Sequence, residues 1–352
     1  MGLMNYLVRR LATFIPTLIG VLLITYLISY AIPADPVRAW VGTKLLNPAA
    51  LEQIREKYKF NAPWYEQFIY LVTQLLKGEL EDPIRKKNIF EELTIKFAIT
   101  IEVAIISFLF VIAIGIPLGI IAAAKKDTVI DFLVRVFALI GSSLPPFVLF
   151  YFLIFVFFVR YKTTPLAGIP MPSQACLVWL STLPGSIPVI GHLVSAVGSV
   201  PLFGGMLCGE WEIVADTFRR LYLPGLALGL LSGGFVARIV RNSLLDALSS
   251  EYVLFMKARG LNRLSIWRHA LKNAMVPVIT VLGMIFGWLL SGTVIAEIIF
   301  NIPGMGRYMY DAISRLNFPV IIATTFVVAL TYLIINLVVD ILYAIIDPRV
   351  RY

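Results

Sequence analysis

The sequence contains few of the residues that build most catalytic and metal centres. Its 352 residues include only two histidines, His192 and His269, and only two cysteines, Cys176 and Cys208. Two cysteines exclude a disulfide framework, a CxxC metal signature and an iron–sulfur spacing. The motifs GxxxxGK[ST], HExxH and GxSxG are also missing. We therefore expect no catalytic residue, no metal and no cofactor bound by this chain.

Charged residues are scarce as well. They form 14% of the chain, against 59% hydrophobic residues, whereas about a quarter of the residues in soluble domains are charged. The formal net charge is +9, but the basic residues stand in short clusters between apolar runs, which is typical of loops that face a cytoplasmic leaflet. The composition therefore favours membrane lipid, and not nucleic acid, as the surroundings of this chain.

Six segments approach the length of about 20 apolar residues that crosses a bilayer as a helix. These segments are 11–32, 97–124, 136–159, 221–237, 274–296 and 318–346. The first is too long for a signal-peptide core and lacks a cleavage site, so we expect it to be retained. The sequence predicts an all-α polytopic membrane protein with about six transmembrane helices.

Short-loop Lys and Arg residues predict the orientation of these helices. The basic clusters are Arg9 and Arg10, Lys125 and Lys126, the seven basic residues of 238–272, and Arg349 and Arg351. With six spans, all four clusters lie on one side of the membrane. We therefore expect a protein of the cell membrane with both termini in the cytoplasm. The predicted parts are 1–96, a first transmembrane helix plus an external segment; 97–346, the transmembrane core; and 347–352, a cytoplasmic tail.

The core is predicted to contain an external insertion near 161–218 and a cytoplasmic loop at 246–273. Residues 177–200 are apolar, but prolines and glycines interrupt them, and a seventh span there would place the most basic loop outside. Cys176 and Cys208 fall in this insertion, where an oxidising compartment favours pairing. Two alternatives stay open for them: a disulfide and two buried thiols.

In the first external segment, Asn61, Pro63 and Trp64 predict the start of a helix. This helix is expected to lie against the membrane face or to dock an external partner.

Small residues recur every four positions on the fourth and fifth predicted spans. They are Gly225, Gly229, Gly233, Gly283, Gly287 and Ser291. Such stripes let helix backbones approach closely, so we expect helix packing, with a role in lining a pathway as the alternative. Polar residues inside spans are candidates for function: Glu102, which is expected near the outer interface, Asn336, and Asp340, which is expected to pair with Arg238.

A short cytoplasmic helix is predicted between Ser250 as its N-cap and Gly260 as its stop. Glu251 near its start, and Lys257 and Arg259 near its end, suit the helix dipole. A helix of this length is unstable alone in water. Its residues Tyr252, Phe255 and Met256 are expected to share one side, which would bury them against the chain's own membrane face or against a cytoplasmic partner.

The segments EYVLFMKARGL and RHALKNAMVP, from 251 to 277, resemble the cytoplasmic signature loop of binding-protein-dependent ABC permeases of the dipeptide, oligopeptide and nickel subgroup. The segments YLVRRLATFIPTLIGVLLITYLISYAIPADPV, IGIPLGIIAAAKKD, PGMGRYMYDAI and VVDILYAIIDPRVRY are similar to other parts of that subgroup. The likeness covers most of the chain except about 166–217. Leu254, Phe255 and Met256 stand where the wider family has Glu-Ala-Ala, and Asn317 stands where relatives often have Asp.

The resemblance implies an ABC importer permease fold and no enzymatic activity in this chain. It implies an ATP-driven importer in which this permease pairs with a homologous second permease, two ATPase subunits that bind ATP and Mg, and an extracytoplasmic substrate-binding protein. Peptides are the first expectation for the substrate, oligosaccharides or nickel the alternatives, and a secondary transporter the distant one. The residues implied to couple to the ATPase are Glu251, Tyr252, Phe255, Met256, Lys257, Ala258, Arg259, Gly260 and Leu261.

Overall fold

The computed structural model describes residues 3–32, 37, 48–163, 165, 169–170, 172–176, 198 and 200–346. This part of the chain is helical, with only an isolated bridge between Glu81 and Asn88 outside the helices and turns. The helices are α1 (Leu3–Ala31), α3 (Pro48–Lys57), α4 (Trp64–Lys77), α5 (Ile89–Ala124), α6 (Val129–Ser143), α7 (Pro146–Leu153), the π-helix η1 (Ile154–Arg160), α10 (Pro201–Cys208), α11 (Trp211–Ser249), α12 (Glu251–Ala258), α13 (Arg263–Gly292), α14 (Val294–Ile299), α15 (Met305–Ser314) and α16 (Phe318–Ile346).

Five of these helices, α1, α5, α11, α13 and α16, are long and apolar enough to cross a membrane. A sixth span is formed if α6 and the segment Pro146–Arg160 are counted together. The predicted all-α membrane fold with about six spans is therefore confirmed.

The third span is not the single helix predicted over 136–159. The chain bends by 106° between α6 and the segment Pro146–Arg160. Leu144 is extended, with ψ of 126°, and Pro145 and Pro146 follow it. Proline lacks the N–H that a helix needs and disfavours helical backbone at the residue before it. The continuous-helix prediction is wrong because hydropathy alone does not register this break.

Several other helices extend beyond their predicted limits. The side chain of Asn88 accepts a hydrogen bond from Phe90 N at 2.8 Å, so α5 begins at Ile89 and not at 97. Helix α11 covers 211–249, and its first two turns take in residues that we assigned to the external insertion. Hydropathy locates only the lipid-embedded part of a helix, whereas caps and polar contacts decide where the helix ends.

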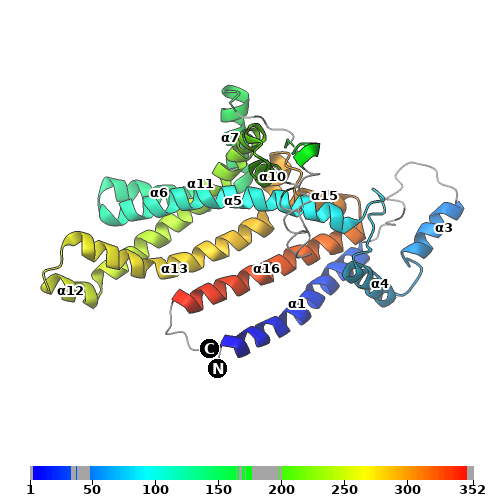
Figure 1. Ribbon diagram of the computed structural model, residues 1–352, viewed down its shortest axis with the longest axis horizontal. Coiled ribbons are helices and arrows are strands. Elements are labelled where there is room, and N and C mark those ends of the chain that lie inside the picture. The colour runs from blue at the N-terminus through cyan, green and yellow to red at the C-terminus, as the bar shows by residue number, and fades with distance from the viewer. Residues whose placement is uncertain are drawn as a thin grey trace.

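The long helices run side by side, with α5, α6 and α13 around α11 and with α1 beside α16 (Figure 1). The glycine stripes lie in these contacts. A Cβ added to Gly225 would lie 2.6 Å from Ile106 of α5, and one added to Gly287 would lie 3.2 Å from Ile335 of α16. Gly229 and Gly233 face α5 in the same way, and Gly283 faces α16. The side chain of Ser291 lies outside the described residues.

Figure 1 places α12, the turn between α5 and α6, the start of α1 and the end of α16 toward one end of the bundle, and α3 and α4 at the opposite end. Near the first end, Arg10 of α1 pairs with Asp340 of α16 at 3.0 Å. The predicted pairing of Asp340 with Arg238 is therefore wrong. The Arg238 guanidinium instead lies 5.4 Å from the ring centroid of Phe235.

Helix α4 begins at Trp64 after Pro63, which stands at the N-cap position. The predicted cap, Asn61, instead donates a hydrogen bond to Glu52 at 2.8 Å. Leu71 and Leu75 are buried on the inner side of α4, and Tyr26 of α1 donates a hydrogen bond to Gln67 at 3.1 Å. This helix therefore packs on the chain's own first span.

Candidate functional site

The short helix α12 connects α11 to α13 at the end of the bundle, as Figure 1 shows. It ends in a Schellman motif: Gly260 N donates to Lys257 O at 3.0 Å, and Leu261 N donates to Met256 O at 3.2 Å. Gly260 has a φ of +74°, a conformation that glycine adopts without the steric cost of a Cβ. The predicted glycine stop is thus present, and it turns the chain toward α13.

The start of α12 differs from its prediction. Ser250 occupies the N-cap position, but its side chain makes no capping hydrogen bond. The Ser250 hydroxyl instead donates to Ala247 O at 2.5 Å. Because α12 follows α11 after a single residue, this hydroxyl is placed to satisfy one of the last carbonyls of α11, that of Ala247.

The apolar side chains of α12 divide between two faces. Val253 is fully buried, and Tyr252 and Met256 are partly buried. In contrast, Leu254 is 69% exposed and Phe255 is 58% exposed. Helical spacing places Phe255 on the same side as Tyr252 and Met256, but Phe255 lies at the exposed edge of that side, and the described part of the chain does not bury it. The angle at which α12 leaves α11 buries Val253 and turns Leu254 and Phe255 outward.

Charged residues surround the outer face of α12, which we define as Leu254, Phe255 and Leu261. Glu251, Lys257, Ala258 and Arg259 are all exposed. The Arg259 guanidinium lies 4.6 Å from the ring centroid of Phe255. An apolar centre with a charged rim is the usual composition of a surface that binds another protein.

A second feature, the central cavity, lies where the break between α6 and α7 faces α11 and α13. Its volume is about 450 Å³. The residues that line it are Gly141, Ser142, Leu144, Pro146, Leu231, Ser232, Phe235, Val281, Met284, Ile285 and Trp288. The lining is mostly apolar, and Ser142 and Ser232 supply its hydroxyl groups.

The central cavity was not predicted from sequence, and none of the five described glycines among the predicted small-residue positions lines it. The six predicted positions lie on α11 and α13, and the five described glycines among them contact other helices. The adjacent Pro145 and Pro146 were the one available signal, because two prolines inside a predicted span indicate a break that opens the packing.

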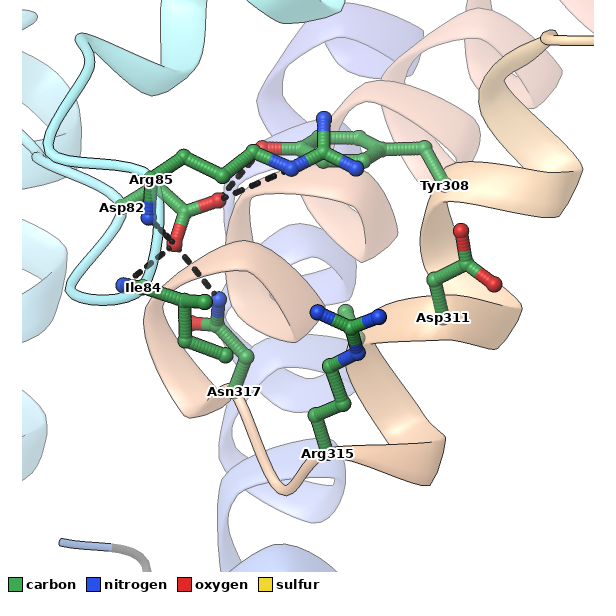
Figure 2. Close-up of a pocket in the computed structure, with 8 residues that line it drawn as sticks. Asp82, Ile84, Arg85, Tyr308, Asp311, Arg315 and Asn317 are labelled. Atoms are coloured by element: carbon green, nitrogen blue, oxygen red, sulfur yellow. Dashed lines mark hydrogen bonds and ion pairs between the residues drawn. The ribbon is translucent and has the colours of Figure 1, made fainter. Parts of the chain in front are cut away.

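The end of the bundle that carries α4, which we call the α4 end, contains a buried polar network around Asp82 (Figure 2). This carboxylate is 2% exposed and accepts hydrogen bonds from Ile84 N at 2.8 Å, Asn317 Nδ2 at 2.8 Å and Tyr308 Oη at 3.3 Å. Burial, with the nearby charge of Asp82, raises the pKa of Tyr308 above its usual range. The amide of Asn317 suits this position, because an aspartate there would repel Asp82.

Glu297 forms a second buried centre at the same end. Its Oε1 accepts hydrogen bonds from Thr100 Oγ at 2.7 Å and Thr293 Oγ at 2.9 Å, and its Oε2 accepts one from Arg307 N at 3.0 Å. Burial raises the pKa of Glu297, and the hydrogen bond from Arg307 N opposes that rise. These contacts join the start of α15 to α5.

Glu102 and the two cysteines fix both ends of α10. Glu102 is fully buried, and its Oε1 accepts hydrogen bonds from Leu202 N at 2.8 Å and Phe203 N at 3.1 Å. The prediction that Glu102 reaches the outer interface is therefore wrong. A disulfide joins Cys176 to Cys208, whose Cα atoms are 5.8 Å apart. Residues 177–197, in which a seventh span was weighed, lie outside the described residues.

The described residues contain no group of three or more His, Cys, Asp or Glu side chains that could hold a metal ion. The polar centres described above receive their hydrogen bonds from neighbouring side chains and backbone groups of this chain, whereas Glu102 Oε2 and Asn317 Oδ1 are buried with no hydrogen-bond partner among the described residues. Their geometry supports structural roles at the α4 end, whereas α12 and the central cavity present surfaces that other molecules could contact.

Comparison with known proteins agrees with this arrangement. Residues 115–352 match the family described as the binding-protein-dependent transport system inner membrane component, and residues 3–88 match the N-terminal family of such components. The chain is 34% identical over 352 residues to the dipeptide transport system permease protein DppB of Alkalihalophilus pseudofirmus, covering 99% of this chain and 100% of that protein.

Two proteins of Escherichia coli strain K12 are similarly related. The dipeptide transport system permease protein DppB is 32% identical over 352 residues, with 99% of each chain covered. The probable D,D-dipeptide transport system permease protein DdpB is 36% identical over 333 residues, covering 94% of this chain and 93% of that protein. With its five or six membrane-spanning helices, the chain therefore belongs to the binding-protein-dependent transport system inner membrane components, a family of multi-pass transport permeases.

Proposed function

We propose that this chain is the permease subunit of an ATP-driven importer and forms part of the path for small peptides. The relatives named above are dipeptide permeases that match this chain over 94% to 99% of its length, which supports peptides over oligosaccharides or nickel. A binding protein delivers the peptide from outside, a homologous second permease completes the path, and two ATPase subunits bind Mg and ATP and hydrolyse the nucleotide.

The observation that carries this proposal is the outer face of α12. Leu254 and Phe255 are more than half exposed on a helix of eight residues, which is too short to persist without packing. The charged rim argues against burial of this face in lipid, because charged side chains are costly there. A groove on the ATPase that receives an amphipathic helix fits both observations.

The central cavity supports the proposed path. Its volume of about 450 Å³ falls in the range of pockets that hold small molecules. A lining of apolar groups and two serine hydroxyls allows a peptide to pass without strong binding to a charged group. We propose that the second permease faces this cavity and closes it.

The proposed orientation places both termini, the loop around Lys125 and the turn at Gly260 in the cytoplasm. It can be tested with single-cysteine variants treated with a membrane-impermeant thiol reagent on intact cells. Leu76→Cys, at a position that is 72% exposed on α4, should be labelled from outside, whereas Asn262→Cys should be protected. The reverse labelling pattern would contradict the orientation.

The function itself can be tested with proteoliposomes that contain this chain, a second permease, the two ATPase subunits and the binding protein. We expect uptake of a labelled dipeptide that requires both ATP and the binding protein. Uptake by this chain alone would instead support a secondary transporter. Mass spectrometry of the ligands retained by the binding protein would reassign the substrate if it detected oligosaccharides or nickel and no peptides.

A further inference from the structure

A buried ion pair joins α6 to α11 between α12 and the central cavity. Asp131, in the first turn of α6, is fully buried, and Arg241 of α11 donates to both of its carboxylate oxygens, from Nε at 2.5 Å and from Nη2 at 2.8 Å. Asp127 N donates to the same carboxylate at 3.1 Å. A bidentate pair of this kind fixes both the distance and the orientation of its two partners.

The position of this pair along the two helices is informative. Arg241 lies about 15 Å along α11 from the start of α12, at 1.5 Å per residue. Asp131 lies about 18 Å along α6 from Ser143, where the chain breaks and the central cavity begins. The ion pair therefore stands between the helix that we propose to contact the ATPase and the helix that forms one wall of the cavity.

Small residues make part of the remaining contact between α6 and α11. A Cβ added to Gly234 would lie 3.0 Å from the Cα of Ala138, and one added to Gly141 would lie 3.3 Å from Leu230 O. Ala237 of α11 also belongs to this contact, together with Val134 of α6. Small residues let the two helices approach closely. The ion pair adds a bidentate contact, which fixes the position of the two helices relative to each other.

We propose that Asp131 and Arg241 are positioning residues that make α6 and α11 move as one body. When the ATPase displaces α12, α11 moves, and the ion pair carries α6 and the cavity wall with it. Without the pair, α11 slides past α6, and ATP hydrolysis continues without an equal movement of the cavity wall. This inference rests on the proposed function.

The test measures ATP hydrolysed per peptide imported in the reconstituted complex. Two variants should each raise this ratio by about tenfold: Arg241→Ala and Arg241→Lys. The lysine keeps the charge but cannot make the bidentate contact. A tenfold change lies within the range that coupling free energies usually produce. Arg10→Ala is the matched control, because it breaks another ion pair between spans, the 3.0 Å pair with Asp340 of α16. It should leave the ratio unchanged.

A chemical link provides a rescue that does not depend on charge. In the variant with Asp131→Cys and Arg241→Cys, the ratio should be high before cross-linking. It should return toward the wild-type value once a short bis-maleimide joins the two thiols. The native cysteines are already joined in a disulfide, so they do not compete for the reagent.

Two outcomes would overturn the inference. One is an unchanged ratio in all the Arg241 variants. The other is a parallel loss of uptake, ATP hydrolysis and assembled complex that the cross-link does not reverse, because that pattern shows a role in folding only. A wild-type complex that imports no peptide would instead contradict the proposed function.

Discussion

The α4 end of the bundle buries polar side chains, whereas the end that carries α12 exposes apolar ones. Asp82 is 2% exposed and Glu297 is fully buried at the α4 end, but Leu254 of α12 is 69% exposed. The hydrogen bonds of the buried centres come from this same chain, and no described part of the chain covers the outer face of α12. Substitutions at the α4 end should therefore lower the stability of the permease, and substitutions on α12 should lower its assembly with partners.

The largest effect on stability is expected for Glu297→Ala. This change leaves the hydroxyls of Thr100 and Thr293 and the backbone N–H of Arg307 without their common acceptor. Buried groups without partners cost about 1 to 3 kcal/mol each, so we expect a loss of about 4 kcal/mol in the free energy of unfolding. Denaturant unfolding of the purified permease in detergent provides the measurement. A loss below about 1 kcal/mol would contradict this account.

Glu297→Gln is the control, and it also tests the protonation state. Burial raises the pKa of Glu297, so the folded state favours the neutral acid. The stabilisation from this group is therefore present below the ordinary glutamate pKa of about 4.3 and is lost as the pH rises through the raised value. The wild type should lose stability over that pH range relative to Glu297→Gln, and parallel pH curves would contradict the assignment.

A smaller loss is expected when the disulfide is removed. Replacing Cys176 and Cys208 by serine opens a loop that spans 32 positions, and chain entropy predicts a cost of about 3.7 kcal/mol. We expect this cost to appear as faster proteolysis near α10, while Glu102 still holds the start of that helix. Intact mass after alkylation, with and without reductant, checks the bond. Two alkylated thiols without reductant would contradict it.

At the α12 end, Phe255→Asp should lower ATPase association by about 2 kcal/mol, the size expected for an aromatic anchor in an interface. Stability should change little, because Phe255 is 58% exposed. Leu76→Asp is the matched control, since Leu76 is 72% exposed on α4 at the opposite end. Co-purification of the ATPase, normalised to inserted permease, measures both variants. Equal co-purification would remove this face from the interface.

The helical spans could be predicted because the signal for them is local. Each needs about 20 apolar residues in a row, and sequence alone shows such runs. Gly260 was predictable for the same reason, since the end of a helix is decided within a few residues. The bend after Ser143 was missed because the prediction weighed hydropathy and gave no weight to Pro145 and Pro146.

Other features depend on segments that are distant in sequence. Thr100 and Glu297 meet across 197 positions, and no local pattern indicates that contact. Asp340 pairs with Arg10 because α1 packs beside α16, an arrangement that charge spacing cannot reveal. The exposure of Phe255 could not be predicted, because a helical pattern shows which residues share a side but not how much of that side the bundle covers.

The smallest expected effect compares one glycine from each end. Gly260 and Gly78 both have a φ of +74°, and a Cβ added to either would meet nothing within 4 Å. Gly260→Ala and Gly78→Ala therefore carry the same backbone cost of about 1 kcal/mol, with no steric clash. Gly78 ends α4, so its variant should lower only the stability of the permease.

Gly260→Ala should act differently because Gly260 directs the exit of α12. An alanine there favours a change of backbone that rotates the outer face of α12 away from the ATPase, so association should weaken by about fivefold while the permease stays inserted. Gly260→Val, whose branched side chain resists the left-handed region more strongly, should weaken it further. Binding of the ATPase to permease in nanodiscs separates the two glycines. Equal affinities for Gly260→Ala and Gly78→Ala would show that the direction of α12 does not contribute to docking.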